Sequence, residues 1–151
     1  MVALYVGSLV SGSGKTTICA GLGKHLLSSG QRVGFFRPVV AASNEKDGDV
    51  AFIKHLFTLE ESQDILGPVF RDEVCLKNGL KEAYARVAPD KDVVIVEGVF
   101  GQSQSSSDLV AVLEAKVIVV ADYSEELLPV IEAGRRYGER LLGIIIDKVP
   151  K

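Results

Sequence analysis

Near-continuous apolar runs alternate with amphipathic stretches along the chain. The runs lack the polar alternation of a half-exposed strand, so they predict strands covered on both faces of a parallel sheet. The predicted strands lie at 2–6, 32–37, 93–96, 116–121 and 142–146. Helical spacing of apolar residues between them predicts helices at 18–26, 49–57, 76–87, 109–113 and 125–137. This order predicts an α/β fold, a doubly wound, mostly parallel sheet of about five strands with helices on both faces.

Three stretches interrupt this pattern. Residues 41–48 are polar and predict a loop, residues 58–70 are irregular with a Gly-Pro pair at 67–68, and residues 98–107 predict a second loop. The sequence contains no internal repeat. A chain of 151 residues with 47% hydrophobic content can bury a substantial core. We therefore expect residues 1–151 to form a single domain, with the alternative that they are the N-terminal part of a longer protein.

Charge and composition exclude several classes of partner. The formal net charge is −3, and no basic cluster is longer than Arg135-Arg136, so a nucleic-acid partner is not expected. No apolar run approaches the roughly 18 residues of a membrane span, and the N-terminal segment lacks the pattern of a signal peptide. Cys19 and Cys75 have neither disulfide-framework nor metal spacing, and we expect both to be reduced. A cytoplasmic location with no membrane partner follows as an expectation.

A glycine-rich loop between the first strand and the first helix carries the chemistry. It contains Ser11, Gly12, Ser13, Gly14, Lys15, Thr16 and Thr17. The glycines allow backbone N–H groups to turn around an anion, and the following helix adds the positive end of its dipole. Lys15 would reach the β- and γ-phosphates of a nucleotide, and the Thr16 hydroxyl would bind Mg²⁺.

The match to the GxxxxGK[ST] consensus is complete only in its second half. Leu9 occupies the position of the first consensus glycine, although Gly7 lies two residues earlier. The alternative interpretation is a glycine-rich turn from strand to helix with an incidental lysine. The placement of the loop between a predicted strand and a predicted helix favours the phosphate-binding interpretation.

Charged residues follow several predicted strands, where ligands bind in open α/β sheets. Glu97 ends the third strand and either faces Mg²⁺ or is a solvated strand-end carboxylate. Asp47 and Asp49 flank Gly48, and each is either a second carboxylate near the metal or a helix N-cap. Arg37 ends the second strand and either binds a substrate carboxylate or phosphate or forms a surface ion pair. All of these alternatives stay open from the sequence.

The order of these motifs resembles the dethiobiotin synthetase family. It is more similar still to the dethiobiotin-synthetase-like N-terminal domain of some phosphate acetyltransferases and of proteins that carry a DRTGG domain. The motifs in chain order are the G-K-T-T loop, Phe36-Arg37-Pro38-Val39, Asp49 leading a helix, Val96-Glu97-Gly98 with Gly101, Val119-Val120-Ala121-Asp122 and the segment from Gly143 to Pro150. The resemblance spans almost the whole chain.

The resemblance implies a P-loop NTPase-like fold that binds ATP and Mg²⁺, in which true synthetases phosphorylate a carbamate and close a ureido ring. Lys15 and Thr16 match the phosphate and metal positions, and Asp49 and Glu97 match the carboxylates near the metal. The family's dimers imply that a homodimer is the alternative to an attached C-terminal domain. Complete synthetases continue beyond the fifth strand.

The sequence also departs from the family pattern. Arg37 stands where the family usually has lysine, and a glutamine- and serine-rich segment at 102–107 replaces a glycine-rich loop. Asp147 corresponds to an asparagine that commonly recognises adenine, and an ionised carboxylate accepts a hydrogen bond but cannot donate one. We therefore expect weak discrimination between ATP and GTP if Asp147 faces the base, and no effect if it points away.

Two functions from different classes remain. In the favoured one, the protein is a nucleotide-binding regulatory module whose loop at Glu97-Gly98 responds to the nucleotide. In the alternative, it is an ATP-dependent ligase of dethiobiotin synthetase type that activates a small carboxylate or carbamate. Lys15 and Arg37 are then the catalytic residues, with Lys15 neutralising the transferred phosphate and Arg37 holding the acceptor.

Overall fold

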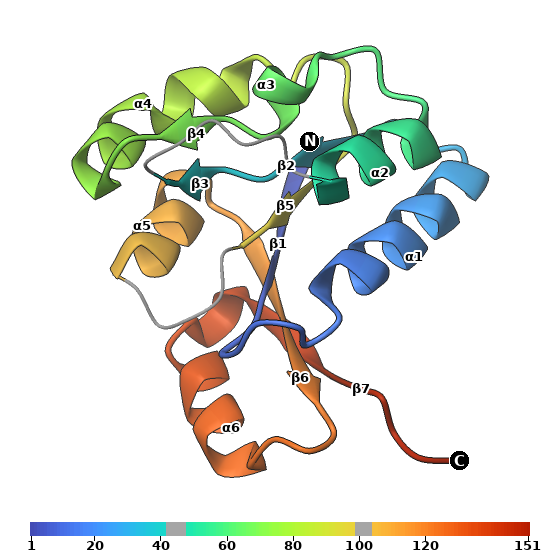
Figure 1. Ribbon diagram of the computed structural model, residues 1–151, viewed down its shortest axis with the longest axis vertical. Helices are drawn as coiled ribbons and strands as arrows, with labels where there is room; N and C mark the ends of the chain where they lie inside the picture. The colour runs from blue at the N-terminus through green and yellow to red at the C-terminus, as the bar shows by residue number, and fades with distance from the viewer. Residues whose placement is uncertain (42–47, 99–103) are drawn as a thin grey trace.

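A parallel sheet forms the centre of the molecule in the computed structural model, which describes residues 1–41, 48–98 and 104–151. Five strands of these described residues pair in the order β2-β5-β1-β6-β7, and every pairing is parallel (Figure 1). The strands are β1 (Val2–Gly7), β2 (Val33–Phe36), β5 (Val93–Glu97), β6 (Lys116–Asp122) and β7 (Leu141–Asp147). The predicted α/β fold is confirmed, because the five apolar runs are these five strands.

Helices connect the strands and cover the sheet. They are α1 (Lys15–Ser28), α2 (Gly48–Phe57), α3 (Gln63–Leu66), α4 (Glu73–Ala85), α5 (Gln104–Val112), α6 (Leu127–Arg135) and a 3₁₀ turn, η1 (Gly138–Arg140). In Figure 1, α1 and α2 lie on one side of the sheet, and α5 and α6 lie on the other. No helix that the structure describes is long and apolar enough to cross a membrane.

A short second sheet fixes the chain after β2. It pairs β3 (Val39–Val40) with β4 (Val69–Phe70) in parallel. Only β4 lies in the stretch 58–70 that the sequence predicted to be irregular, and β3 ends just before the loop predicted at 41–48. The backbone N–H of Arg37 also donates to the carbonyl of Leu66, at 2.7 Å. Elements of two to four residues leave no periodic signal, so only the tertiary pairing reveals them. Their effect is to hold the residues that follow β2 in one position.

The start of α5 differs most from the predicted boundaries. The sequence predicted a helix from Leu109, whereas α5 begins at Gln104. Its first turn carries serines, which give no apolar periodicity, although Ser106 is buried. Of the loop predicted at 98–107, residues 99–103 lie outside the described residues and residues 104–107 belong to α5.

The core lies on both faces of the central strands. Val94, Ile95 and Val96 of β5 have no exposed surface. The close approach of α1 to α2 depends on Gly23, because a Cβ atom there would collide with the ring of Phe57. Burial of a phenylalanine side chain stabilises the fold by about 1.5–3 kcal/mol. This contact packs the last residue of α2 against α1, and the contact of Asp49 with Thr16 joins the N-terminal ends of the two helices, where the candidate site lies.

Candidate nucleotide-binding site

The glycine-rich loop has a backbone conformation that only glycine adopts without strain. Gly12 and Gly14 have φ angles of 74° and 96°, in the left-handed region. Gly14 is the N-cap of α1, so the positive end of the helix dipole faces the loop. A Cβ atom on Gly14 would also collide with the carboxylate of Asp147. The loop thus has the shape and the helix end that an anion site requires.

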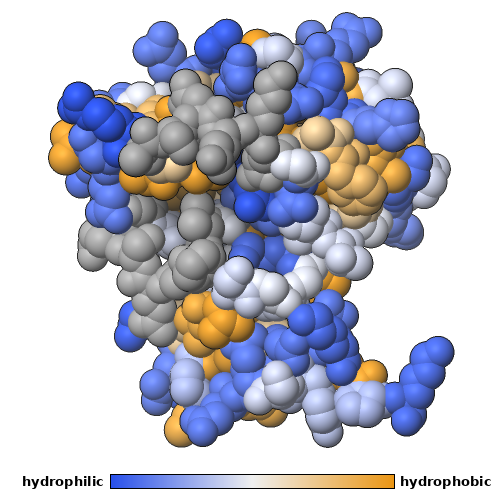
Figure 2. Space-filling view, in the orientation of Figure 1, coloured by the Kyte–Doolittle hydropathy of each residue, from blue (hydrophilic) through white to orange (hydrophobic). Residues whose placement is uncertain are grey.

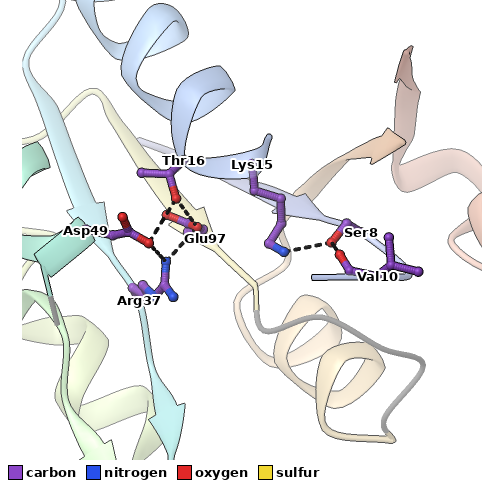
Figure 3. A network of polar contacts seen from close by, with 7 residues as sticks. All are labelled: Ser8, Val10, Lys15, Thr16, Arg37, Asp49 and Glu97. Atoms are coloured by element: carbon purple, nitrogen blue, oxygen red, sulfur yellow. Dashed lines mark hydrogen bonds and ion pairs between the residues drawn. The ribbon is translucent and has the colours of Figure 1, made fainter. Parts of the chain in front are cut away.

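Lys15 contacts the chain just before this loop. Its ammonium group donates to the Ser8 hydroxyl at 2.7 Å, and that hydroxyl donates to the carbonyl of Val10 at 2.8 Å (Figure 3). Burial lowers the pKa of Lys15, and the charge of Glu97 opposes this effect. Ser8 was missed by sequence reasoning, because a serine after a strand is too common to indicate a role. The cation therefore lies beside the loop before any phosphate arrives.

Four side chains from four segments meet at the start of α1. Thr16 Oγ1 lies 2.8 Å from Glu97 Oε1 and 3.3 Å from Asp49 Oδ2. Nη1 of Arg37 donates to the same two oxygens, at 2.7 Å and 3.1 Å respectively (Figure 3). The structure thus brings together all three residues predicted for the metal, and adds Arg37 to them. Asp47, the other candidate carboxylate, lies outside the described residues.

Glu97 is a buried carboxylate at this junction. Its residue surface is only 1% exposed, so it is not the solvated strand-end group of the alternative interpretation. Burial raises its pKa, and Arg37 and Thr16 oppose that shift. Its Oε2 atom is buried and has no hydrogen-bond partner among the described residues. A buried oxygen of this kind is available to a ligand, because burial without a partner is costly.

The end of β7 contacts the loop from the other side. Asp147 lies against Gly14, and Lys148 donates to the carbonyl of Gly12 at 2.6 Å. Lys148 also pairs with Asp122 at 2.7 Å, and has a left-handed φ of 58°. The hydrogen bond from Lys148 holds the pKa of Asp122 below its usual range. Sequence reasoning gave Lys148 and Asp122 no role, because strands β6 and β7 are brought together only by the fold.

The remaining loop residues differ in exposure. Ser11 and Thr17 are exposed, whereas Ser13 is buried. The Ser13 hydroxyl oxygen has no hydrogen-bond partner among the described residues. All the residues predicted to contact nucleotide phosphates therefore lie in one loop and the first turn of α1.

Comparison with known proteins identifies the family. The AAA_26 family, described as an AAA domain, matches residues 2–151. The chain belongs to this family. The predicted resemblance to dethiobiotin synthetase-like P-loop proteins is thereby confirmed.

Two curated relatives and one solved structure illustrate the similarity. Phosphate acetyltransferase of Pseudomonas aeruginosa is 30% identical, in a match that covers 99% of this chain and 25% of that protein. ATP-dependent dethiobiotin synthetase BioD of Methanococcus vannielii is 26% identical, with 95% and 78% covered. The kinase domain of the Escherichia coli tyrosine kinase ETK has a TM-score of 0.72 at 15% identity, with 99% and 68% covered. The last likeness confirms the P-loop NTPase-like fold, and the chain spans a quarter of the acetyltransferase it matches.

The residues of this AAA_26 domain fit a nucleotide with Mg²⁺. The space beside Gly12 is open, because a Cβ atom there would meet nothing within 4 Å, and Glu97 Oε2 is a buried oxygen without a hydrogen-bond partner among the described residues. Hydroxyl and carboxylate oxygens are the ligands that Mg²⁺ prefers. No group of three or more His, Cys, Asp or Glu side chains in the described part of the chain could hold a metal. Phosphate and water oxygens would therefore have to complete the coordination, as is usual for Mg²⁺ bound with a nucleotide.

Proposed function

We propose that this chain is a Mg²⁺-dependent ATP-binding domain that reports its nucleotide state to an attached domain or a second subunit. The observation that carries the proposal is the partly buried contact network around Thr16. It connects the phosphate-binding loop to Glu97, Asp49 and Arg37, which come from three other segments. A metal ion bound with ATP at Thr16 would act on all three segments at once.

The binding step uses the loop and its lysine. Backbone N–H groups around Gly12 and Gly14 and the N-terminal end of α1 would bind phosphate oxygens. Lys15 would exchange the Ser8 hydroxyl for the β- and γ-phosphates, because a charged acceptor makes the stronger hydrogen bond. Ser11, Ser13 and Thr17 would complete the phosphate contacts. Mg²⁺ would bind the side chains of Thr16, Asp49 and Glu97, directly or through water.

The reporting step starts at Glu97. Gly98 follows it, and its Cα lies against the ring of Tyr5, because a Cβ atom there would collide with that ring. The Tyr5 hydroxyl makes a hydrogen bond with Ser106 of α5, and burial raises the pKa of Tyr5 to about 12. Tyr5 therefore contacts both the residue after Glu97 and the helix that follows. A shift of Glu97 on metal binding would be passed to α5 through this side chain.

The base preference depends on Asp147. The side chain lies beside Gly14, so it is near the bound phosphates or the nucleoside. The family resemblance favours adenine, whereas a carboxylate accepts from the amino group of adenine but cannot donate to its ring nitrogen. We propose ATP as the ligand, with discrimination against GTP of less than about tenfold.

An ATP-dependent ligase of dethiobiotin synthetase type is the second candidate. It is favoured by the similarity to BioD, of which the match covers 78%. Lys15 and Arg37 would be its catalytic residues, neutralising the transferred phosphate and holding a small carboxylate. Phosphate release in the presence and absence of diaminopelargonic acid and bicarbonate separates the two functions. Turnover that depends on these compounds would favour the ligase.

The setting that we propose is the cytoplasm. ATP is available there, and Cys19 and Cys75 are free thiols, as expected in a reducing compartment. The proposed partners are a second copy of the chain, forming a homodimer, or an attached C-terminal domain.

Titration calorimetry with ATP and Mg²⁺ tests the binding step. Lys15→Ala should weaken ATP affinity by about tenfold or more, because it removes the cation beside the loop. Lys24→Ala is the matched control, since Lys24 is an exposed lysine on the same helix. It should leave the affinity unchanged. Equal affinity of wild type and a folded Lys15→Ala variant would contradict the proposal.

A further inference from the structure

Arg37 already uses the carboxylate oxygens that a metal ion would need. Its Nη1 atom lies 2.7 Å from Glu97 Oε1 and 3.1 Å from Asp49 Oδ2. Thr16 Oγ1 contacts the same two oxygens from the side of the phosphate-binding loop (Figure 3). A single guanidinium nitrogen thus bridges the two carboxylates opposite the hydroxyl. Bridging of this kind is what a bound cation does.

Mg²⁺ and the guanidinium group cannot share these oxygens in the observed arrangement. Mg²⁺ binds oxygens at about 2.0–2.1 Å and holds its remaining positions with water or phosphate. The guanidinium group is a cation, so it and Mg²⁺ repel each other.

The exposure of the partners decides which one leaves. The Arg37 side chain is 24% exposed, whereas that of Glu97 is 2% exposed. A partly exposed arginine can swing its guanidinium group toward solvent, but the buried carboxylate has to stay. Glu97 would therefore exchange one cation for another, and its charge would be compensated in both states.

We infer that Arg37 is an internal counter-cation that closes the metal position until Mg²⁺ arrives on a nucleotide. The inference rests on the proposed function, because it concerns the same metal position. Free Mg²⁺ has to displace Arg37 unaided and binds weakly. Mg²⁺ on ATP brings phosphate oxygens that complete its coordination, and these phosphates also accept the released guanidinium group. The contact makes occupancy of the metal position depend on nucleotide.

An ion pair at the opposite end of β2 provides the control. Arg32 precedes β2 and pairs with Asp92 through two nitrogens, at 3.1 Å and 2.8 Å. This pair is exposed and lies at the other end of the strand from Arg37. Removal of Arg32 changes the net charge by the same amount as removal of Arg37. Only Arg37 touches the proposed metal ligands among these two arginines.

The test is a titration of the nucleotide-free protein with Mn²⁺, which binds oxygen ligands as Mg²⁺ does and is visible by electron paramagnetic resonance. Arg37→Gln should bind Mn²⁺ at least about tenfold more tightly than wild type, because the competing charge is gone. Arg32→Gln should match wild type. Equal or weaker binding by Arg37→Gln would overturn the inference, and so would the absence of metal binding in all three proteins.

A measurement on wild type covers the case in which Arg37→Gln does not fold. Guanidinium ¹⁵N resonances of Arg37 should shift as Mg²⁺ is added, while those of Arg32 stay constant. Saturation with Mg²⁺ that leaves the Arg37 resonances unchanged would overturn the inference. Failure of the proposed function would appear elsewhere, as equal ATP binding by wild type and Lys15→Ala, so the two failures can be distinguished.

Discussion

The two sides of the glycine-rich loop are held by polar contacts that differ in burial. On one side, Thr16 meets Glu97, Asp49 and Arg37. On the other, Lys148 contacts the Gly12 carbonyl and Asp122. Both sides contain carboxylates and a basic side chain, and both join segments far apart in the sequence. The residue types alone therefore do not distinguish them.

Burial gives the two sides opposite electrostatic behaviour. The Glu97 side chain is 2% exposed, and burial raises its pKa. The side chains of Asp122 and Lys148 are 20% and 53% exposed, and their hydrogen bond lowers the pKa of Asp122. Water therefore screens the charge of Glu97 less than the charges of Asp122 and Lys148. Figure 2 shows hydrophilic and hydrophobic residues interspersed on one face of the molecule, in the orientation of Figure 1.

This difference indicates separate roles for the two sides. A buried charge needs a partner at all times, so in our proposal the side with Glu97 would respond strongly to the exchange of Arg37 for a metal ion. The pair of Asp122 and Lys148 is more exposed and can be solvated with or without a bound ligand. We therefore expect this pair mainly to hold the shape of the loop. Three substitution experiments can break or sharpen this comparison.

The largest expected effect is that of Glu97→Gln on the contribution of Mg²⁺ to nucleotide affinity. The substitution keeps the shape of the side chain but removes its charge, so Mg²⁺-dependent affinity should fall roughly 10- to 100-fold. Affinity measured with a chelator should change little. Calorimetry with and without Mg²⁺ provides both values. Asp122→Asn is the control and should leave the affinities with and without Mg²⁺ nearly unchanged. An equal loss of affinity in both conditions for Glu97→Gln would show that the role of Glu97 is structural.

An intermediate effect is expected from Gly14→Ala. Its left-handed backbone should cost about 1–2 kcal/mol of unfolding free energy, and the new Cβ atom meets Asp147 in addition. Gly12→Ala is the matched variant, because Gly12 is also left-handed but a Cβ atom there meets nothing within 4 Å. In urea unfolding, the free energy of unfolding of Gly14→Ala should be lower than that of Gly12→Ala.

The double variant Gly14→Ala/Asp147→Ala separates the two causes. Its free energy of unfolding should rise from that of Gly14→Ala to about that of Gly12→Ala, because the collision with Asp147 is gone. The cost of the left-handed backbone should remain. A Gly14→Ala variant as stable as Gly12→Ala would show that Asp147 moves aside freely.

The smallest effect is expected from Asp122→Asn, and only in acid. Because the folded pKa of Asp122 lies below its usual value of 3.8, its ionised form is favoured by the fold. The stabilisation is present above pH 3.8 and is lost as the pH falls through the folded pKa. Asp122→Asn should therefore lose less stability than wild type below that pH. Thermal unfolding of both proteins across the acid range measures this difference in stability. Identical profiles of stability against pH would show that Lys148 does not favour the charged form of Asp122.

The sequence by itself determined the fold class and the position of the glycine-rich loop between β1 and α1. Both are local signals, because apolar runs identify buried parallel strands and the residues from Gly12 to Thr16 are contiguous. The carboxyl-end rule for parallel sheets also selected Arg37 and Glu97 as candidates. It left open whether each was functional or solvated, because exposure cannot be seen in a local pattern.

Only the tertiary structure decided which charges are buried and which partners they have. The contact of Arg37 with Glu97 joins residues 60 positions apart, and that of Lys148 with Gly12 joins residues 136 apart. Such pairs depend on strand order and on close approaches such as that of Gly23 to Phe57. The sheet order β2-β5-β1-β6-β7 sets β5 beside both β1 and β2, and thereby brings Glu97 to Thr16 and Arg37. The free energy of a charge depends on its surroundings, and those surroundings exist only in the folded chain.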